Sequence, residues 1–399
     1  MFSKVVVAFF LALLAISAES RPVRRGGSCR ARSSSAIPTA TKLGVVVATS
    51  QIEVAHPSSS VVSSSTAAPV KASSSASSAA AAVKISSVAS AAPTTTSKAA
   101  VKTTKASSVA QAAPTSAAKG LLGNLFPVNS FSKSWTTSPS SNQALALSDA
   151  AFRPQNVLRT VPHTYTKAPD GKDAMKAHYP QGSYTFGNYP QGGFSFYAPG
   201  PSNVDLTTAK EATFGYSVFF PEGFAFNLGG KLPGLYGGNS EEQAIGCSGG
   251  SRSTACFSAR LMWRENGAGE FYTYLPPYTI PAFSANNKVC NVAPKSDCNP
   301  EYGASVGRGA FKFATGAWTT ISERVKLNDV GQANGELELF VNGQSVINVG
   351  GLILRDSAAG RIRGMQMQTF FGGSKPQFKS PKDQDLFFSD FSVAITKTL

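Results

Sequence analysis

The chain has 399 residues, and its 37 Lys and Arg against 22 Asp and Glu give a formal net charge of +15. Residues 1–119 hold 13 basic and 2 acidic residues, whereas residues 120–399 hold 24 and 20 and are therefore almost balanced. Because the excess of positive charge precedes residue 120 and no nucleic-acid-binding module is recognisable, the composition argues against a nucleic-acid partner.

Residues 1–20 have the pattern of a secretory signal peptide. Lys4 precedes an apolar run, Val5 to Ile16, and the small residues Ser17 and Ala18 follow. The run is too short to span a bilayer comfortably, and no later stretch reaches the roughly eighteen apolar residues of a membrane span. We therefore expect an exported protein, extracellular or associated with a cell wall, with no membrane contact after removal of the signal.

Residues 21–120 are predicted to form a disordered stalk. From Ser33 to Lys119 the composition is dominated by Ser, Thr, Ala, Val and Pro, with scattered Lys. Such a segment cannot bury enough apolar surface to offset the entropy lost on ordering. Ser/Thr-rich tracts with Pro are typical of O-glycosylated stalks in exported proteins.

Residues 121–399 are predicted to form one all-β domain, because short apolar or alternating runs recur between turns rich in Gly and Pro. Asn342-Gly343 is typical of a two-residue hairpin turn. This pattern favours a jelly-roll β-sandwich of the concanavalin-like kind. The predicted strands are Val157–Tyr165, Ser183–Phe186, Gly193–Tyr197, Glu211–Phe219, Ala255–Arg264, Phe271–Leu275, Trp318–Leu327, Gly335–Val341, Ser345–Val349, Arg363–Phe371 and Asp385–Ile395.

Four cysteines fall in two close pairs, Cys247 with Cys256 and Cys290 with Cys298. Close pairs in an exported protein favour two local disulfides, although four cysteines allow three pairings. The histidines are not at ligand spacing near these cysteines, so we expect no metal site. The fifth cysteine, Cys29, lies in the stalk and is expected to be free or intermolecular.

The segment from Leu228 to Gly238 places five glycines around a single lysine, Lys231. Such a segment is expected to be a loop whose backbone can approach a ligand closely. Its spacing does not fit a phosphate-binding loop, so the pattern does not indicate nucleotide binding.

Polar side chains alternate on two neighbouring predicted strands. Ser258, Arg260 and Arg264 share one face of the first strand, and Tyr272 and Tyr274 share one face of the second. The residues between the strands have the length of a hairpin turn. If the turn leaves an odd number of residues unpaired, the arginine and tyrosine faces coincide. An even number would place the tyrosines beside Leu261 and Trp263, which are expected in the core.

These motifs resemble polysaccharide lyase family 14 over roughly residues 155–397. The resemblance lies in Gly-Gly-Lys-Leu-Pro-Gly-Leu, Ser-x-Arg-x-Met-Trp-Arg and Tyr-x-Tyr, in that order, and in the segments 369–374 and 389–391. It implies a jelly-roll enzyme, here a secreted fungal member, that cleaves alginate or glucuronan by β-elimination. The resemblance assigns the catalytic positions to Lys231, Ser258, Arg260, Tyr272 and Tyr274.

Residue chemistry agrees with this assignment. Cleavage of a 4-linked uronic acid requires removal of the C5 proton, and Arg260 and Lys231 can neutralise the adjacent carboxylate as charge develops. We expect Tyr272 or Tyr274 to act as base and acid, because neighbouring cations lower a tyrosine pKa. The alternative makes Lys231 the base and leaves Ser258 and the tyrosines to orient the sugar. Neither scheme needs a cofactor or a metal.

Four further side chains are predicted to bind substrate: Arg264, Gln366, Gln368 and His178. For the glutamines the alternative is an exposed sheet face, and for His178 it is a hydrogen-bonded histidine at the start of a strand.

The predicted partner is an acidic polysaccharide, bound by a monomer. A non-catalytic module that binds acidic glycans and a structural cell-wall protein remain alternatives. A hydrolase is disfavoured, because no paired carboxylates flank the predicted site. The sequence leaves open which polymer of mannuronate, guluronate or glucuronate is used.

Overall fold

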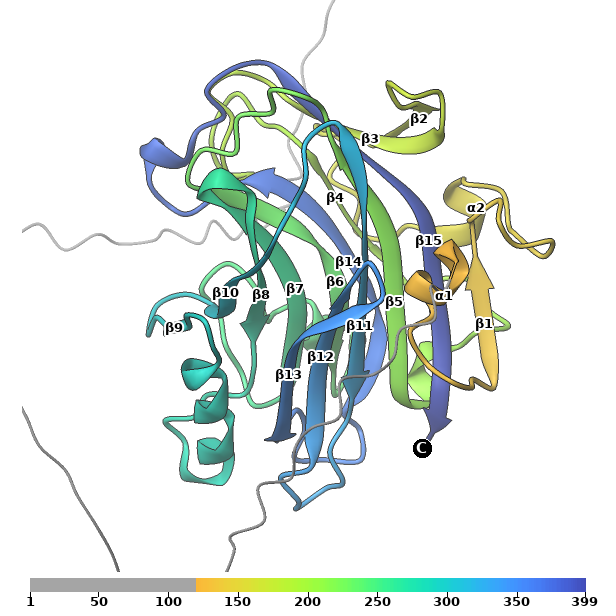
Figure 1. Ribbon diagram of the computed structural model, residues 1–399. Helices are drawn as coiled ribbons and strands as arrows, with labels where there is room; N and C mark the ends of the chain where they lie inside the picture. Colours follow the sequence, from red (N-terminus) through yellow and green to blue (C-terminus); the bar gives the residue numbers. More distant parts are fainter. Residues whose placement is uncertain (1–119) are drawn as a thin grey trace, which may run out of the picture. The chain divides into compact units, whose positions relative to one another are not determined.

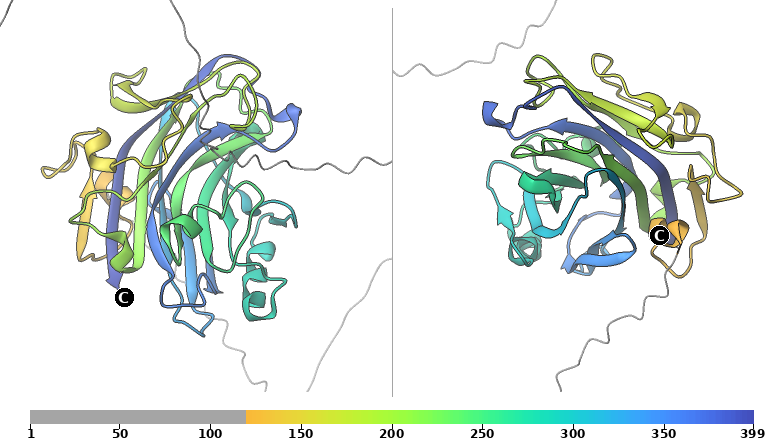
Figure 2. Two further views of the ribbon diagram at one scale, coloured as in Figure 1. Left: turned by 180° about the vertical axis from the view of Figure 1, so that it is seen from behind. Right: turned by 45° about the horizontal axis from the view of Figure 1, so that its top comes forward.

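Two antiparallel β-sheets account for most of residues 120–399, which are the residues that this computed structural model describes (Figure 1). The predicted signal peptide, the predicted stalk up to residue 119 and Cys29 lie outside the described residues. The two sheets lie against each other as curved layers (Figure 2). This arrangement is the predicted β-sandwich, so the predicted fold class is confirmed.

The larger sheet has eight strands, and β5 and β15 lie near its centre. Its strands, in spatial order, are β13 (Gln344–Leu352), β12 (Gly335–Val341), β11 (Ala317–Lys326), β5 (Ala209–Phe220), β15 (Gln384–Thr398), β3 (Asp173–Tyr179) and β2 (Thr164–Lys167), with β1 (Lys133–Thr136) paired to β15.

The second sheet has seven strands, and β6 and β7 lie near its centre. Its strands, in spatial order, are β4 (Phe194–Ala198), β14 (Arg361–Phe371), β6 (Gly229–Gly238), β7 (Cys256–Arg264), β8 (Ala268–Tyr274), β10 (Ala304–Lys312) and β9 (Asp297–Cys298).

The helical segments between the strands are short. Within residues 120–399 no helix is long and apolar enough to cross a membrane. The segments are α1 (Leu121–Leu125), α2 (Asp149–Phe152), η1 (Leu206–Thr208), α3 (Glu241–Ala244), η2 (Glu265–Gly267), η3 (Pro281–Asn291) and η4 (Pro376–Phe378).

The hydrophobic core lies between the two sheets, where alternate residues of each strand point inward. Trp263 on β7 is fully buried there, as predicted. Its ring packs edge-on against Phe371 and Phe220, with centroids 5.2 and 5.7 Å away. This packing fixes which side of β7 faces the core, so the polar residues that alternate with Trp263 face outward.

Two of the strand predictions are wrong. Val157–Tyr165 contributes only its last two residues to β2, and Ser183–Phe186 is irregular, with a left-handed φ of 46° at Thr185. Apart from the two residues in β2, the apolar and aromatic residues in both segments lie on irregular backbone. Their composition is typical of a strand, although no strand forms there.

Five strands were not predicted: β1, β3, β6, β9 and β10. β10 shows the reason, because its pairing with β8 is interrupted between Val306 and Phe311. Gly307 and Gly309 have positive φ in that interruption, and such glycines are read from sequence as the end of a strand.

The hairpin and both disulfides are confirmed. Asn342 and Gly343 both have positive φ, at 49° and 79°, between β12 and β13. Cys247 is bonded to Cys256, and Cys290 is bonded to Cys298. Each bond therefore closes a local loop beside the seven-stranded sheet.

Candidate active site

A pocket of about 340 Å³ lies on the face of the seven-stranded sheet that points away from the core. Lys231, Arg260, Tyr272 and Tyr274 line it from three adjacent strands, β6, β7 and β8. They share this face because they alternate with residues that point into the core. Loops complete the lining with Thr185, Phe186, Ser248, Gly249, Tyr302, Gly372, Gly373 and Ser374, and β14 adds Gln368 and Phe370.

The glycine-rich segment around Lys231 is a strand and not the predicted loop. It forms β6, which pairs with β7 on one side and β14 on the other. Its glycines allow close packing, since a Cβ at Gly230 would lie 2.1 Å from the Trp263 ring and one at Gly237 would lie 2.5 Å from the Phe257 ring. The prediction failed because glycine and proline are usually depleted in strands.

Lys231 holds its amine in a buried position with no carboxylate partner among the described residues. Its Nζ lies 2.7 Å from Met262 Sδ and 3.4 Å from the centroid of the Tyr272 ring. Burial, followed by the charges of Arg264 and Arg260, places the pKa of Lys231 well below its usual range. An uncharged amine is thus accessible at lower pH than for an exposed lysine.

Arg260 lies directly opposite Tyr272 in the pairing of β7 with β8. The arginine and tyrosine faces therefore coincide, which is the first of the two alternatives for this hairpin. The Arg260 side chain is only 1% exposed, and its Nη1 donates to Gln368 Oε1 at 2.8 Å. Its Nε has no hydrogen-bond partner among the described residues. Arg260 nevertheless lines the pocket, so its positive charge is available to attract an anionic ligand.

Tyr272 and Tyr274 form an edge-to-face pair with centroids 5.8 Å apart. The Tyr274 hydroxyl oxygen accepts a hydrogen bond from the Gly250 backbone N–H at 3.0 Å. Gly303 packs against both rings, since a Cβ there would lie 2.7 Å from Tyr274 and 2.8 Å from Tyr272. The pair is therefore held from two sides.

The expected lowering of the tyrosine pKa does not occur at Tyr272. Burial raises the pKa of Tyr272, and Tyr274 raises it further, whereas Arg264 and Arg260 lower it by less. The sequence shows the neighbouring cations, which lower the pKa of a tyrosine, but it does not show the burial of the phenol, which raises that pKa. Tyr272 is therefore protonated at neutral pH.

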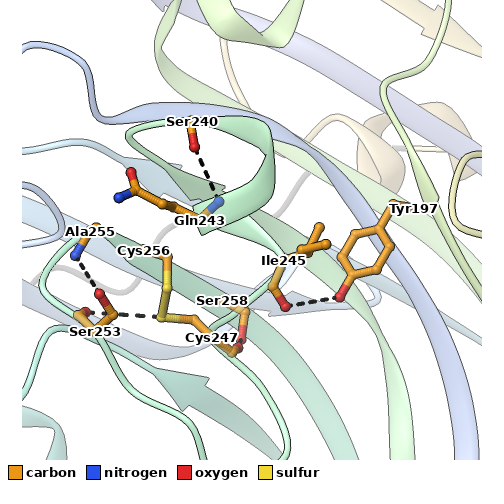
Figure 3. The surroundings of a disulfide bond; sticks show 9 residues. All are labelled: Tyr197, Ser240, Gln243, Ile245, Cys247, Ser253, Ala255, Cys256 and Ser258. Atoms are coloured by element: carbon orange, nitrogen blue, oxygen red, sulfur yellow. Dashed lines mark hydrogen bonds between the residues drawn. A yellow bond between two sulfur atoms is a disulfide. The ribbon is translucent and has the colours of Figure 1, made fainter. Parts of the chain in front are cut away.

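Ser258 does not line the pocket. The residue is 1% exposed, and its Oγ donates to the Cys247 carbonyl at 2.8 Å. Figure 3 shows Ser258 beside Cys247 of the disulfide. Cys247 and Cys256 close the loop that carries Ser248, Gly249 and the N–H bonded to Tyr274. In this structure Ser258 supports the wall of the pocket through that loop.

Arg264 is engaged by Glu270, a residue that the sequence analysis missed. Glu270 is fully buried on β8, and its Oε1 accepts from Arg264 Nε at 2.8 Å. Its Oε2 accepts from Arg308 Nε at 2.8 Å and from Ser305 Oγ at 2.5 Å. The Arg264 guanidinium lies 5.7 Å from the Tyr272 ring centroid. Glu270 lies two positions before Tyr272 and therefore shares its face of the strand, which is the sequence pattern that could have indicated it.

Gln366 and Gln368 do not form an exposed sheet face. Gln366 is buried and donates to Tyr197 Oη at 3.2 Å and to Gln368 Oε1 at 3.0 Å. Gln368 lines the pocket and donates to Ser195 Oγ at 3.0 Å. This chain of amides fixes the oxygen that receives Arg260, so Gln366 acts behind the pocket and Gln368 at its surface.

His178 lies outside the pocket. It is on β3 of the eight-stranded sheet, and its Nδ1 is 2.7 Å from Asp385 Oδ1 on β15. The hydrogen-bonded alternative therefore describes His178 in this structure, and no contact with the pocket supports its predicted role in binding.

Two loops that the sequence analysis did not single out meet beside the pocket. Tyr302 precedes β10 and Ser374 follows β14, and their hydroxyl oxygens are 2.8 Å apart. β6, β7 and β8 separate β14 from β10 in the sheet, so this contact reaches across the strands that carry the polar residues. Only tertiary structure brings these two residues together.

The family model of polysaccharide lyase 14 matches residues 167–391. This match covers more than half of the chain, and the chain therefore belongs to that family. Within residues 120–399 no group of three or more His, Cys, Asp or Glu is arranged to hold a metal ion.

Two solved structures are similar in sequence and fold. A marine alginate lyase of the same family from Aplysia kurodai is 30% identical with a TM-score of 0.56, and the match covers 67% of this chain and 100% of that one. Alginate lyase vAL-1 from Chlorella virus is 28% identical with a TM-score of 0.50, covering 61% and 93%. Exolysin of Paramecium bursaria Chlorella virus 1 is 28% identical over 184 residues, and the match spans 28% of its length.

Proposed function

We propose that this protein is a polyuronate lyase that cleaves 4-linked uronic acid polymers by β-elimination. The observation that carries the proposal is the pairing of two buried cations, Lys231 and Arg260, with two tyrosines in one pocket of a polysaccharide lyase 14 chain. The similar structures from Aplysia kurodai and Chlorella virus are both alginate lyases. An N-terminal signal pattern supports action outside the cell.

Arg260 is the proposed binding group for the uronate carboxylate. Its guanidinium is buried, and no carboxylate among the described residues pairs with it. A buried cation without an anionic partner favours an anionic ligand. Holding the carboxylate there stabilises the charge that develops when the C5 proton leaves.

Lys231 is the proposed base. Its lowered pKa makes the uncharged amine accessible, whereas burial keeps Tyr272 protonated. These two shifts support Lys231 over Tyr272 as the base. The amine takes the C5 proton, and the electrons of the C5–H bond form the C4–C5 double bond as the C4–O4 bond breaks.

Tyr274 is the proposed acid. Its oxygen accepts the N–H of Gly250, which leaves its own O–H available to donate into the pocket. Transfer of that proton to O4 gives a free hydroxyl on one product, and the other product carries the unsaturated uronate. Tyr272 then positions the Lys231 amine, whose Nζ lies over its ring.

Incubation with polymannuronate, polyguluronate and glucuronan tests the proposal, with the ultraviolet absorbance of the unsaturated uronate as the readout. We expect a rise with at least one polymer and its loss in Lys231→Ala and Tyr274→Phe. Ser345→Ala, on β13 of the other sheet, is the control and should keep full activity. Binding without any rise in absorbance would instead indicate a non-catalytic glycan-binding module.

A further inference from the structure

A bulge interrupts β6 beside the proposed catalytic groups. Leu232 pairs with Leu261 and Leu235 pairs with Ala259, so Pro233 and Gly234 together face the single residue Arg260. A Cβ at Gly234 would lie 2.7 Å from the Arg260 Cα, which shows how closely the bulge approaches β7. The extra residue thus lies against Arg260 and two positions from Lys231.

The bulge determines which way the side chains of β6 point. Leu232 and Leu235 both lie in the core, three positions apart, whereas Lys231 lies on the outer face. A regular strand alternates with a period of two, so it could not place all three side chains in this way. Loss of the bulge would therefore move either Lys231 or Leu235 to the wrong face.

Backbone groups that leave the ladder at a bulge need other partners. Here two core side chains of the opposite sheet supply them. Glu323 Oε1 on β11 accepts from the Leu235 N–H at 2.5 Å. Tyr216 Oη on β5 donates to the Pro233 carbonyl at 3.2 Å. The two ends of the bulge are thus held from across the core.

Glu323 is costly to keep in this place. It is 1% exposed between the core residues Ile321 and Val325, and its Oε2 has no partner among the described residues. Burial raises its pKa well above the usual range, which favours the uncharged acid. A hydrophobic residue would be cheaper in the core. The contact with Leu235 is the interaction that distinguishes Glu323 from such a residue.

We propose that Glu323, assisted by Tyr216, is a positioning residue that fixes the β6 bulge and thereby the placement of Lys231 and Arg260. This inference rests on the proposed lyase function. It assigns a role in the reaction to a side chain on the far side of the core.

The test compares Glu323→Leu with Glu323→Gln, since glutamine keeps the acceptor and leucine does not. For Glu323→Leu we expect kcat to fall about ten- to a hundredfold with a smaller change in KM, because sub-ångström misplacement of reacting groups is costly. Glu323→Gln should restore most of kcat. Tyr216→Phe, which removes only a hydroxyl, should lower kcat in the same direction and serves if Glu323→Leu does not fold.

A second readout does not depend on turnover. Met262 contacts the Lys231 amine, so the NMR signal of its methyl group reports on that contact. We expect the signal to shift in Glu323→Leu and Tyr216→Phe and to stay in place in Glu323→Gln. The control Glu211→Gln alters another buried glutamate of the same sheet, one paired with Arg324, and should leave the signal unmoved.

Unchanged kcat and an unmoved Met262 signal in folded Glu323→Leu, with only a lower melting temperature, would overturn the inference. If no variant and no wild-type protein cleaves any polyuronate, the lyase proposal fails, and the Met262 signal still decides whether Glu323 positions the Lys231 amine.

Discussion

Lys231 occupies a position in which a positive charge is poorly accommodated. Its amine is surrounded by a thioether and an aromatic ring, with two arginines nearby. The aromatic face compensates part of the lost hydration, but the pKa is still lowered. The residue that we propose as the base is thus one that the folded protein holds at the expense of stability.

Replacement of this amine should therefore stabilise the protein while it abolishes turnover. In Lys231→Met we expect a gain of about 1 kcal/mol in the free energy of unfolding, because a buried ammonium is replaced by an apolar chain of similar length. Thermal unfolding and the absorbance assay on the same preparation measure both effects. A lower melting temperature would show that the ammonium has a compensating partner.

The stabilisation by Lys231→Met should depend on pH. The native pKa of Lys231 is below its usual value of 10.5, so between these two values the unfolded chain binds more protons at this site. Wild-type stability relative to Lys231→Met should consequently rise as the pH rises through that window, and the advantage of the variant should be largest below the native pKa. Denaturant unfolding of both proteins across the alkaline range measures this difference, and a constant difference would contradict it.

Gly303 should be needed for the geometry of the tyrosines. The Cβ of Gly303→Ala would lie within 2.8 Å of both rings, so one ring must move. We expect kcat to fall about tenfold with little loss of stability, because the rings border a pocket into which they can shift. Kinetics and thermal unfolding separate the two effects. Gly350→Ala on β13 of the other sheet is the control, because a Cβ there would meet only Glu336 Cγ at 3.8 Å.

At the scale of single residues, sequence reasoning identified the side chains on the pocket floor but not their states. Alternation and family resemblance identify Arg260, Tyr272 and Tyr274, and the glycine-rich segment and family resemblance identify Lys231. The raised pKa of Tyr272 and the role of Ser258 behind the wall depend on burial, which a sequence does not display. Glu323 is distant in sequence from Leu235, and its contact with that residue depends on tertiary structure, so the sequence did not indicate its role.

At the scale of elements, the hairpin of β7 and β8 was predictable because each strand alternates regularly and the turn between them is short. β6 was not predictable, because Pro233 and the glycines of this strand are residues typical of loops. A glycine-rich strand forms here because aromatic rings and the carbonyls of adjacent strands fill the space where side chains would lie. This condition is set by partners from β7 and β14, and no local pattern contains it.

The loop closed by Cys247 and Cys256 should couple the redox state to activity. It carries Ser248, Gly249 and the N–H that holds the Tyr274 oxygen. In Cys247→Ser/Cys256→Ser we expect a loss of about 2–3 kcal/mol in stability and a marked fall in kcat. Cys290→Ser/Cys298→Ser should lose similar stability with a smaller effect on kcat, since that bond contacts neither Tyr274 nor Ser258. Equal effects on kcat would contradict a specific role of the first loop.

At the scale of the whole molecule, the two sheets have different structural roles. The seven-stranded sheet presents the pocket, and the eight-stranded sheet supports it through the core, with Glu323 and Tyr216 as the polar contacts at the β6 bulge. The sandwich architecture followed in outline from the sequence, whereas five of its strands did not. Which strands are neighbours did not, because order within a sheet is decided by contacts distant along the chain.

The unequal charge along the chain should affect binding of acidic polymers. Residues 1–119 carry 13 basic and 2 acidic residues, and a basic segment attracts polyanions by screened electrostatics. At low salt we expect residues 21–399, the chain after removal of the predicted signal, to bind a polyuronate more tightly than residues 120–399 alone. The difference should disappear as salt is raised. Titration of both proteins across a salt series measures it. A difference that persists at high salt would require specific contacts from residues 1–119.

The contact between Tyr302 and Ser374 has a consequence for where along a polymer the enzyme cuts. Ser374 is exposed and Tyr302 half-buried, so the hydrogen bond between them contributes about 1 kcal/mol and can be exchanged for hydrogen bonds to water. We expect an internal stretch of polymer to reach Lys231 and Arg260 more readily when this bond is broken. This hydrogen bond would thus influence how often the enzyme cuts within a chain and how often it cuts at a chain end.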